Sequence, residues 1–411
     1  MALKNVFIKV KNASCSLALV PDKKINEILN KLAKKLISNR KKILKANSED
    51  LRKIDKNNPI YDRILLNAER INSIAESIKT VASYTSPIGK IIEQRKLKSG
   101  LDLKKISVPF GVVGVIFEAR PNVAVDIFAL CLKSKNACIL KGGSDAENSN
   151  KILVSLIKES LEDLKDCVYL MENNKKNISE FLHADKYVDV IIPRGGAGLI
   201  KFVRENSIIP VIETGAGVVH IYFDESGDAK KGAKIIFNAK TSRPSLCNAM
   251  DTLIIHKSRL NDLQKLCELL EQKNVEIYAD KDSYKILENT YPKNLLFKAK
   301  PEDFGKEFLS LKMSVKTVKN LDEAISHITQ YGSKHSEAII TENKTNSEKF
   351  LQKVDAACVY SNASTRFTDG AEFGLGAEVG VSTQKLHARG PMGIRELTSY
   401  KWVIRGNGQI R

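Results

Sequence analysis

Between residues 109 and 360, short apolar stretches alternate with segments of helical periodicity, and this alternation limits the fold more than any other feature. We predict strands at 112–117, 137–141, 168–171, 188–192, 218–223, 252–255, 275–278, 315–318, 337–341 and 357–360. The helices predicted between them lie at 123–133, 148–164, 228–240, 258–272, 321–331 and 345–353. Short apolar strands separated by helices indicate mostly parallel sheets that are covered on both faces. Such sheets bind ligands beyond the carboxyl ends of their strands.

The chain has 411 residues, which suffices for two or three domains. The alternating pattern suggests two α/β domains with a junction near residue 225. Residues 20–85 have helical periodicity, whereas residues 88–108 are typical of two strands around the turn at 98–100. A charged hairpin of this kind fits an oligomer contact or a surface flap.

Several classes of protein are disfavoured by the composition. No run of 18 apolar residues occurs, and the N-terminus has no long apolar segment before a small-residue cleavage site, so we expect a cytoplasmic protein without a membrane span. The seven cysteines are scattered without a CxxC pair, and the six histidines lack metal-ligand spacing. We therefore expect reduced cysteines and no metal.

The formal net charge of +18 admits two interpretations, a nucleic-acid-binding surface or a lysine-rich solvated surface. Within residues 23–45, apolar residues recur at helical spacing and the lysines fall largely between them. No aromatic residues are interleaved, and no known nucleic-acid motif occurs. The pattern favours a solvated helix surface and no nucleic-acid partner.

Cys247 is the candidate reactive residue, in the stretch TSRPSLCNAM. It follows a predicted helix in a polar turn that also contains Arg243, Ser245 and Asn248. A reactive cysteine needs partial exposure and a cationic or hydrogen-bonding environment that favours the thiolate. The alternative is a small buried apolar residue, which is the usual state of a free cysteine.

Other polar segments follow predicted strands, and each has a structural alternative. In EARPN, the Asn122 amide could donate to an oxyanion or cap the next helix, and alone the residue slightly favours the cap. In CILKGGS, Lys141 and two glycines suit a dinucleotide or an ordinary turn. In PRGGAGL, the glycine-rich turn before a helix suits a phosphate, although it is not the GxGxxG pattern.

Two carboxylates and one long segment are further candidates for a functional role. Glu213 in VIETGAG could be a base or a structural group, and Glu307 in KEFLSL resembles a surface charge. Residues 359–393 are rich in Gly, Ser, Thr and Arg, so they suit an extended loop for an anionic ligand or an oligomer arm.

Taken in order, these segments resemble the aldehyde dehydrogenase superfamily. The motifs EARPNV, RGGAGL, RPS-x-CN, NASTRFTDG, FGLGAE and STQKLHARGPMG are most similar to its γ-glutamyl phosphate reductase branch, essentially from end to end. The resemblance implies two doubly wound α/β domains with a small β oligomerisation arm. The expected divisions are a cofactor-binding domain at 1–224 with the hairpin 88–108 inserted, a catalytic domain at 225–360, and a substrate loop and oligomerisation tail at 361–411.

The resemblance also implies the chemistry. Cys247 would attack γ-glutamyl phosphate, release phosphate and form a thioester, which NADPH reduces to glutamate 5-semialdehyde in the second step of proline biosynthesis. Asn122 and the backbone N–H of Cys247 would form the oxyanion hole. A homodimer or larger homo-oligomer and a possible glutamate 5-kinase partner are further implications.

The remaining site residues are assigned by the same resemblance. Those expected to bind the cofactor are Lys141, Gly142, Ser144, Arg194, Gly195, Gly196, Gly198 and Glu307. Those expected to bind the anionic substrate are Arg120, Arg243, Ser245, Ser364, Thr365 and Arg366. No carboxylate follows Lys141 until Asp145, which favours NADP(H) over NAD because nothing there repels a 2′-phosphate.

Two rival functions stay open. Relatives that hydrolyse their thioester use a glutamate in the place of Glu213 to activate water, and a phosphate-releasing reductase does not need that step. The chain could therefore be a non-phosphorylating aldehyde dehydrogenase, with Glu213 catalytic. It could also be a nucleic-acid-binding or scaffolding protein on the same fold.

Overall fold

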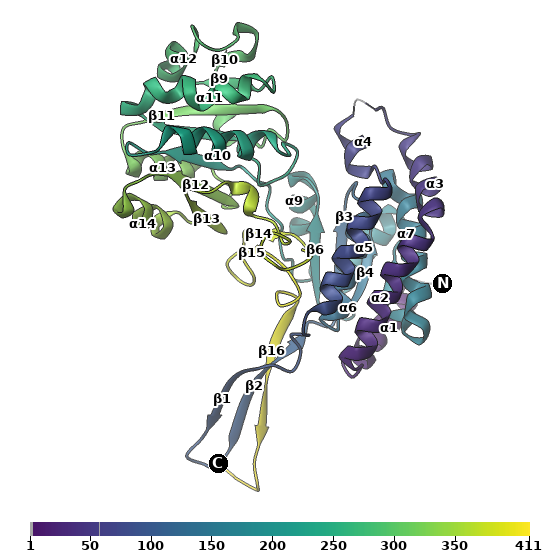
Figure 1. Cartoon of the computed structure of the whole chain (residues 1–411). Coiled ribbons are helices and arrows are strands. Elements are labelled where there is room, and N and C mark those ends of the chain that lie inside the picture. Colours follow the sequence, from purple (N-terminus) through teal and green to yellow (C-terminus); the bar gives the residue numbers. More distant parts are fainter. Residues whose placement is uncertain (1–2, 57) are drawn as a thin grey trace. The chain divides into compact units, whose positions relative to one another are not determined.

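The computed structural model describes residues 3–56 and 58–411, which form two compact units (Figure 1). The first unit contains the chain up to Thr214 together with residues 374–380 and 386–411. The second contains residues 215–373 and 381–385. Both units are α/β, as the alternating sequence pattern predicts.

The first unit is built on a four-stranded parallel sheet. Its strands, in spatial order, are β5 (Val168–Leu170), β4 (Ala137–Lys141), β3 (Val112–Phe117) and β6 (Val190–Arg194). Every residue of the central strand β3 is buried, because helices cover both faces of the sheet. The carboxyl ends of β3, β4 and β6 meet at one edge, where the predicted cofactor residues other than Glu307 lie.

Helices of the first unit account for the long N-terminal region. They are α1 (Leu3–Leu17), α2 (Asp22–Ser38), α3 (Arg40–Leu51), α4 (Pro59–Ile64), α5 (Ala68–Ser83), α6 (Asn122–Lys133), α7 (Glu147–Leu161), α8 (Lys175–Leu182) and α9 (Ala197–Asn206), with 3₁₀ turns η1 (Ser144–Ala146) and η2 (Glu162–Cys167). The apolar stripe expected on α2 is buried. The helix α1 is not among the predicted elements. No helix in the described part of the chain is long and apolar enough to span a membrane.

Three antiparallel strands form a separate ribbon, which we call the arm (Figure 1). They are β1 (Ile91–Lys96), β2 (Asp102–Pro109) and β16 (Thr398–Arg405). The hairpin predicted at 88–108 is thus confirmed as structure, and the C-terminal strand β16 adds to it. The short strand β15 (Gly390–Pro391) also belongs to this unit.

The second unit contains a seven-stranded parallel sheet. In spatial order the strands are β10 (Leu296–Lys298), β9 (Glu276–Ala279), β11 (Lys312–Val318), β8 (Thr252–His256), β7 (His220–Phe223), β12 (Ser336–Ile340) and β13 (Cys358–Ser361). The helices are α10 (Ala229–Thr241), α11 (Leu263–Glu271), α12 (Lys281–Leu287), α13 (Leu321–Tyr331) and α14 (Lys344–Lys353). The remaining pieces are η3 (Lys257–Asp262), η4 (Lys293–Leu295), η5 (Pro301–Gly305), η6 (Thr365–Phe367) and β14 (Val381–Ser382).

The division between the units lies about ten residues before the expected boundary at 224. The physical reason is β7, which pairs with β8 and β12 and therefore belongs to the second sheet. The expected tail 361–411 is likewise shared, since residues 361–373 and 381–385 pack with the second unit and the rest with the first.

Candidate functional site

Cys247 lies in the turn that follows α10, with its side chain partly exposed. Lys240, in the last turn of α10, joins the two ends of this turn, because its buried Nζ donates to the Met250 carbonyl at 2.8 Å. Asp251 lies 3.9 Å from the same ammonium. Burial lowers the pKa of Lys240 to about 8 and raises that of Asp251 to about 6, with each charge opposing the other's shift. These contacts join the end of α10 to the residues that follow Cys247.

A second support for the turn is the backbone of residues 217–220, here called the bracing segment. An added Cβ on Gly217 would lie 1.6 Å from the Cys247 carbonyl oxygen, so only glycine permits this approach. Four successive N–H groups of the segment donate to side chains. The pairs are Gly217 with Glu307 (2.8 Å), Val218 with Ser333 (2.8 Å), Val219 with Asp251 (3.3 Å) and His220 with Glu337 (2.9 Å).

Asn248, next to Cys247, is held from the other side by residues 364–368. The Thr365 hydroxyl donates to the Asn248 carbonyl at 2.8 Å, and the Asn248 amide donates to the Thr368 carbonyl at 2.8 Å. The Arg366 guanidinium donates to Asn248 Oδ1, and its Nε donates to the Ser242 hydroxyl at 3.1 Å. The NASTRF motif and the CN motif, more than 100 residues apart in sequence, therefore form one structure.

The surroundings of Cys247 are cationic. Burial lowers the pKa of Arg366, and the positive charge of Arg243 lowers it further. Asp369, Cys247 and Glu372 act in the opposite direction, which places the Arg366 charge within electrostatic reach of the cysteine. A guanidinium beside a cysteine sulfur favours the thiolate.

The predicted substrate residues of the second unit fall into two groups. Arg243 is exposed, and Ser245 and Arg366 are partly buried, so these side chains can meet a ligand. Ser364 and Thr365 are buried, and their hydroxyls hold the local backbone: Ser364 Oγ accepts from Arg366 N at 3.3 Å, and Thr365 binds Asn248. In this structure these two hydroxyls therefore hold the backbone near Cys247 in place.

Asn122 is the first residue of α6, and its side chain does not cap the helix. The helix-cap alternative is therefore wrong, because the cap residue is Pro121 and the Asn122 amide is turned toward Asp126. Asn122 Nδ2 donates to Asp126 Oδ2 at 2.9 Å. The chain reaches this position through a tight turn in which Ala119 has φ 56° and Arg120 N donates to the Glu118 carbonyl at 2.6 Å.

The predicted cofactor residues of the first unit lie at the carboxyl ends of neighbouring strands. Lys141 ends β4, Arg194 ends β6, and Ser144 begins η1. Burial lowers the pKa of Lys141, and the carboxylate of Glu118 partly opposes this shift. An added Cβ on Gly142 would lie 2.3 Å from Asn150 Nδ2, so this glycine is required by packing.

Glu118 is a functional candidate that the sequence reasoning missed. Its Oε2 accepts from Gly196 N at 2.9 Å and leaves no room for a Cβ on Gly195, at 2.3 Å. The sequence does contain an indication of this residue, because Glu118 directly follows the central strand β3, which lies between β4 and β6. A carboxylate at the N-terminus of α9 indicates that this glycine turn suits an anionic oxygen.

Two predicted glutamates have contacts that bear on their roles. Glu213 lies 3.6 Å from the guanidinium of Arg204, with its side chain about one-fifth exposed. Glu307 accepts the Gly217 N–H, so in this structure it braces the Cys247 turn. Arg194, from the glycine-rich turn, lies 3.9 Å from Glu378.

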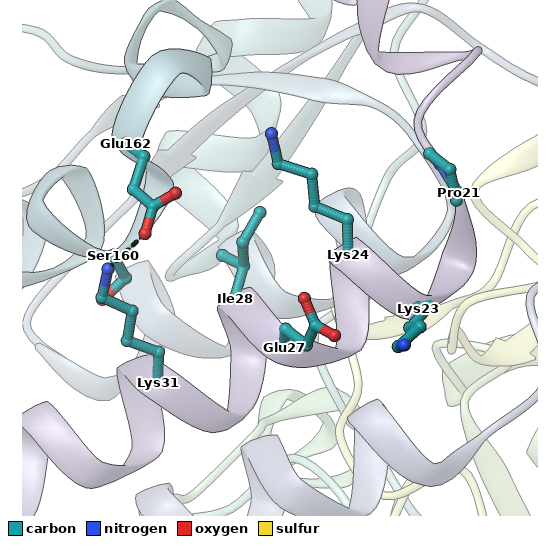
Figure 2. A pocket seen from close by; sticks show the side chains of 8 residues that line it. All are labelled: Pro21, Lys23, Lys24, Glu27, Ile28, Lys31, Ser160 and Glu162. Atoms are coloured by element: carbon teal, nitrogen blue, oxygen red, sulfur yellow. Dashed lines mark hydrogen bonds and ion pairs between the residues drawn. The ribbon is translucent and has the colours of Figure 1, made fainter.

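A surface hollow in the first unit lies apart from all these residues (Figure 2). Its wall includes Lys23, Lys24 and Lys31 from α2. Lys31 pairs with Glu162 at 2.6 Å and Lys24 with Asp163 at 3.0 Å. The lysines of this helix face are thus partly balanced by carboxylates, as expected of a solvated surface.

Comparison with known proteins identifies the class. The model of the aldehyde dehydrogenase family matches residues 4–283. A γ-glutamyl phosphate reductase of Bacteroides thetaiotaomicron is 55% identical over 412 residues, covering 100% of this chain and 99% of the relative. The crystal structure of a γ-glutamyl phosphate reductase from Thermotoga maritima has a TM-score of 0.93 and 42% identity, with 100% of both chains covered. An acetylating aldehyde dehydrogenase from Geobacillus thermoglucosidasius, at 18% identity and a TM-score of 0.71, shares the fold.

The chain belongs to the aldehyde dehydrogenase family and, within it, to the γ-glutamyl phosphate reductases. The predicted fold class is thereby confirmed. The roles of individual residues rest on the geometry above and are developed below as proposals.

The contact between Gly217 and Cys247 gives a direct prediction. Gly217→Ala should lower the free energy of unfolding by about 2–3 kcal/mol, because the new methyl group overpacks the turn. Activity should fall by about 100-fold, since a displacement of about 1 Å at a nucleophile costs that much. Thermal unfolding and steady-state rates measure both effects.

Gly305→Ala is the matched control, because its nearest neighbour to an added Cβ is a Tyr331 ring carbon at 3.4 Å, an ordinary contact. Equal behaviour of the two variants would contradict the bracing role of residue 217.

Proposed function

We propose that this chain reduces γ-glutamyl phosphate to glutamate 5-semialdehyde and phosphate, with NADPH as the reductant and a thioester on Cys247. The observation that carries the proposal is a partly exposed cysteine in a hydrogen-bonded turn, within electrostatic reach of the guanidinium of Arg366. The full-length relatives named γ-glutamyl phosphate reductase support the choice of substrate. The expected place of the reaction is proline biosynthesis in the cytoplasm.

In this mechanism the Cys247 thiolate attacks the acyl carbon and expels inorganic phosphate, which leaves a thioester. The Asn122 amide and the Cys247 backbone N–H would donate to the carbonyl oxygen as negative charge develops on it. A nicotinamide cofactor held at the strand ends that carry Lys141 and Arg194 would supply the hydride for reduction of the thioester. Cys247 then leaves as the thiolate and the aldehyde is released.

Anion recognition would fall to the arginines. Arg243 and Arg366 lie in the Cys247 region, and bidentate guanidinium groups suit both the phosphate and the α-carboxylate of the substrate. Arg120 and Ser245 would add further donors, and Ser364 and Thr365 would act through the backbone they hold.

The cofactor proposal rests on the donors at the edge of the first sheet. Lys141 would meet the adenosine ribose, with Gly142 and Ser144 beside it. The N–H groups of the turn that contains Arg194, Gly195, Gly196 and Gly198 would face the pyrophosphate, in place of the Glu118 carboxylate. Glu307 would bind the nicotinamide ribose in exchange for its bond to Gly217.

The rival hydrolytic function would require Glu213 to activate water. The carboxylate has a cationic neighbour, Arg204, at 3.6 Å. This contact supports an orienting role for Glu213, because an ion pair with Arg204 occupies the carboxylate.

Phosphate dependence tests the proposed function. The reaction is run in reverse, with pyrroline-5-carboxylate and NADP, with and without inorganic phosphate. We expect NADPH formation only with phosphate, and none from a folded Cys247→Ser variant. Equal rates without phosphate would mean that water accepts the acyl group and that Glu213 has the catalytic role of the rival hydrolytic function. No reaction under either condition would refute the substrate.

The preference for NADP(H) gives a second prediction. Ser144→Glu should lower the ratio of kcat/KM for NADP over NAD by at least about tenfold, because a carboxylate there would repel the 2′-phosphate. Ser144→Gln has the same length without the charge and should retain the preference. An unchanged ratio in the Glu variant would contradict the assignment of Ser144.

The arm carries a third prediction, that the protein forms a homodimer or larger homo-oligomer through it. Apolar side chains on β16 are exposed, namely Tyr400 (53%), Trp402 (42%) and Ile404 (57%). Ile404→Glu should shift the protein toward monomers in sedimentation equilibrium, whereas Leu19→Glu, at an apolar residue 86% exposed outside the arm, should not. A monomeric wild type would refute the arm as an interface.

A kinase that transfers a phosphoryl group to the γ-carboxylate of glutamate would supply the substrate. Direct transfer from a bound glutamate 5-kinase stays a prediction.

A further inference from the structure

We propose that Asp126 is a positioning residue that fixes the orientation of the Asn122 amide for oxyanion binding. This inference rests on the proposed function, since it assumes that Asn122 serves the reaction. It goes beyond that function because Asp126 belongs to none of the motifs discussed above.

The geometry is confined to one helix. Asn122 and Asp126 lie four residues apart on α6, so their side chains share a face of the helix. Asn122 Nδ2 donates to Asp126 Oδ2 at 2.9 Å. Asp126 is partly buried, whereas its neighbours on both sides, Val125 and Ile127, are fully buried in the core.

The chemistry of the two groups explains why this contact matters. An ionised carboxylate only accepts hydrogen bonds, whereas an amide has a donor end and an acceptor end. Asp126 therefore selects the orientation in which the Asn122 nitrogen, and not its oxygen, faces the carboxylate. The same nitrogen carries a second hydrogen, which stays available for an oxyanion. The flipped amide would instead present an oxygen to the developing negative charge.

A carboxylate near an oxyanion has an electrostatic cost, and the structure contains a compensating charge. Arg194, from the end of β6, is the cation whose field acts on Asp126, and Arg194 lies 3.9 Å from Glu378. Burial raises the pKa of Asp126 to about 6, while the Asn122 hydrogen bond and Arg194 partly oppose the rise. Below that pH the protonated carboxyl can donate to the amide oxygen, and the selection of orientation is lost.

The test is a double-mutant cycle on Asn122 and Asp126. Asp126→Asn keeps the size of the side chain but can donate as well as accept, so both amide orientations become possible. We expect kcat to fall by about 10- to 100-fold, with the KM values for substrate and cofactor nearly unchanged. In the Asn122→Ala background the same substitution should cost nothing further, because the group through which Asp126 acts is gone.

The pH profile supplies a readout that a merely structural role would not move. In the wild type, kcat should decline as the pH falls through about 6, following the pKa of Asp126, and this decline should be absent in Asp126→Asn. Asp166→Asn, an exposed aspartate of η2, is the control for loss of one negative charge and should keep the wild-type profile.

The outcomes separate the inference from the function on which it rests. If Asn122→Ala is fully active, the proposed role of Asn122 fails. If Asn122→Ala is impaired but Asp126→Asn is not, or if their losses add, the positioning role of Asp126 is refuted. The positioning role would also be refuted if Asp126→Asn lowered thermal stability together with activity and left the pH profile of kcat unchanged. That result would make Asp126 a structural residue.

Discussion

The close approach of Gly217 to the Cys247 carbonyl is the contact on which the arrangement around Cys247 depends. It is possible only because residue 217 has no side chain and because side chains from four different parts of the second unit hold the bracing segment by its N–H groups. From the other side, Thr365 and Arg366 fix Asn248. The backbone on both sides of Cys247 is thus held by hydrogen bonds that do not involve its sulfur.

Several acidic side chains of this protein hold the backbone in place by accepting hydrogen bonds from it. Asp251 serves both the bracing segment and Lys240, and it also accepts from Phe308 N at 2.9 Å. Glu337 is fully buried and accepts from both the backbone and the ring of His220, at 2.9 and 3.0 Å. In the first unit the Glu118 carboxylate accepts a hydrogen bond from Gly196 N, at the N-terminus of α9. The buried carboxylates of Asp251 and Glu337 hold backbone near the strand ends of the second unit in one arrangement.

The sequence predicts the regular elements well, because the strands and helices carry strong local periodicity. The helix predicted at 321–331 matches α13 at both ends, and the strand at 112–117 matches β3. The N-terminal helix α1 was missed, since its lysines and its serine-rich end hide the stripe of Phe7, Val10 and Leu17. The boundary at 224 differs from the observed division because strand pairing, which local sequence does not specify, assigns β7 to the second sheet.

The sequence predicts which residues belong to the candidate site, but it does not predict the contacts that they make. Cys247, Lys141 and Asn122 stand in recognisable motifs, but their partners lie elsewhere in the chain or on another turn of a helix. Glu307 looks like a surface charge in sequence and instead binds Gly217 N, 90 residues away. Glu118 reaches the glycine turn only because β3 and β6 are neighbours. Hydrogen bonds between residues far apart in sequence have no local signal.

In the proposed mechanism the acyl group stays on Cys247 until phosphate removes it. The most direct measurement mixes the enzyme rapidly with pyrroline-5-carboxylate and NADP in phosphate-free buffer, follows NADPH, and maps the acylated peptide by mass spectrometry. We expect a burst of one NADPH per subunit that then stops, an acyl group on the peptide containing Cys247, and turnover that resumes when phosphate is added. Continuous turnover without phosphate, or an acyl group on any other residue, would contradict it.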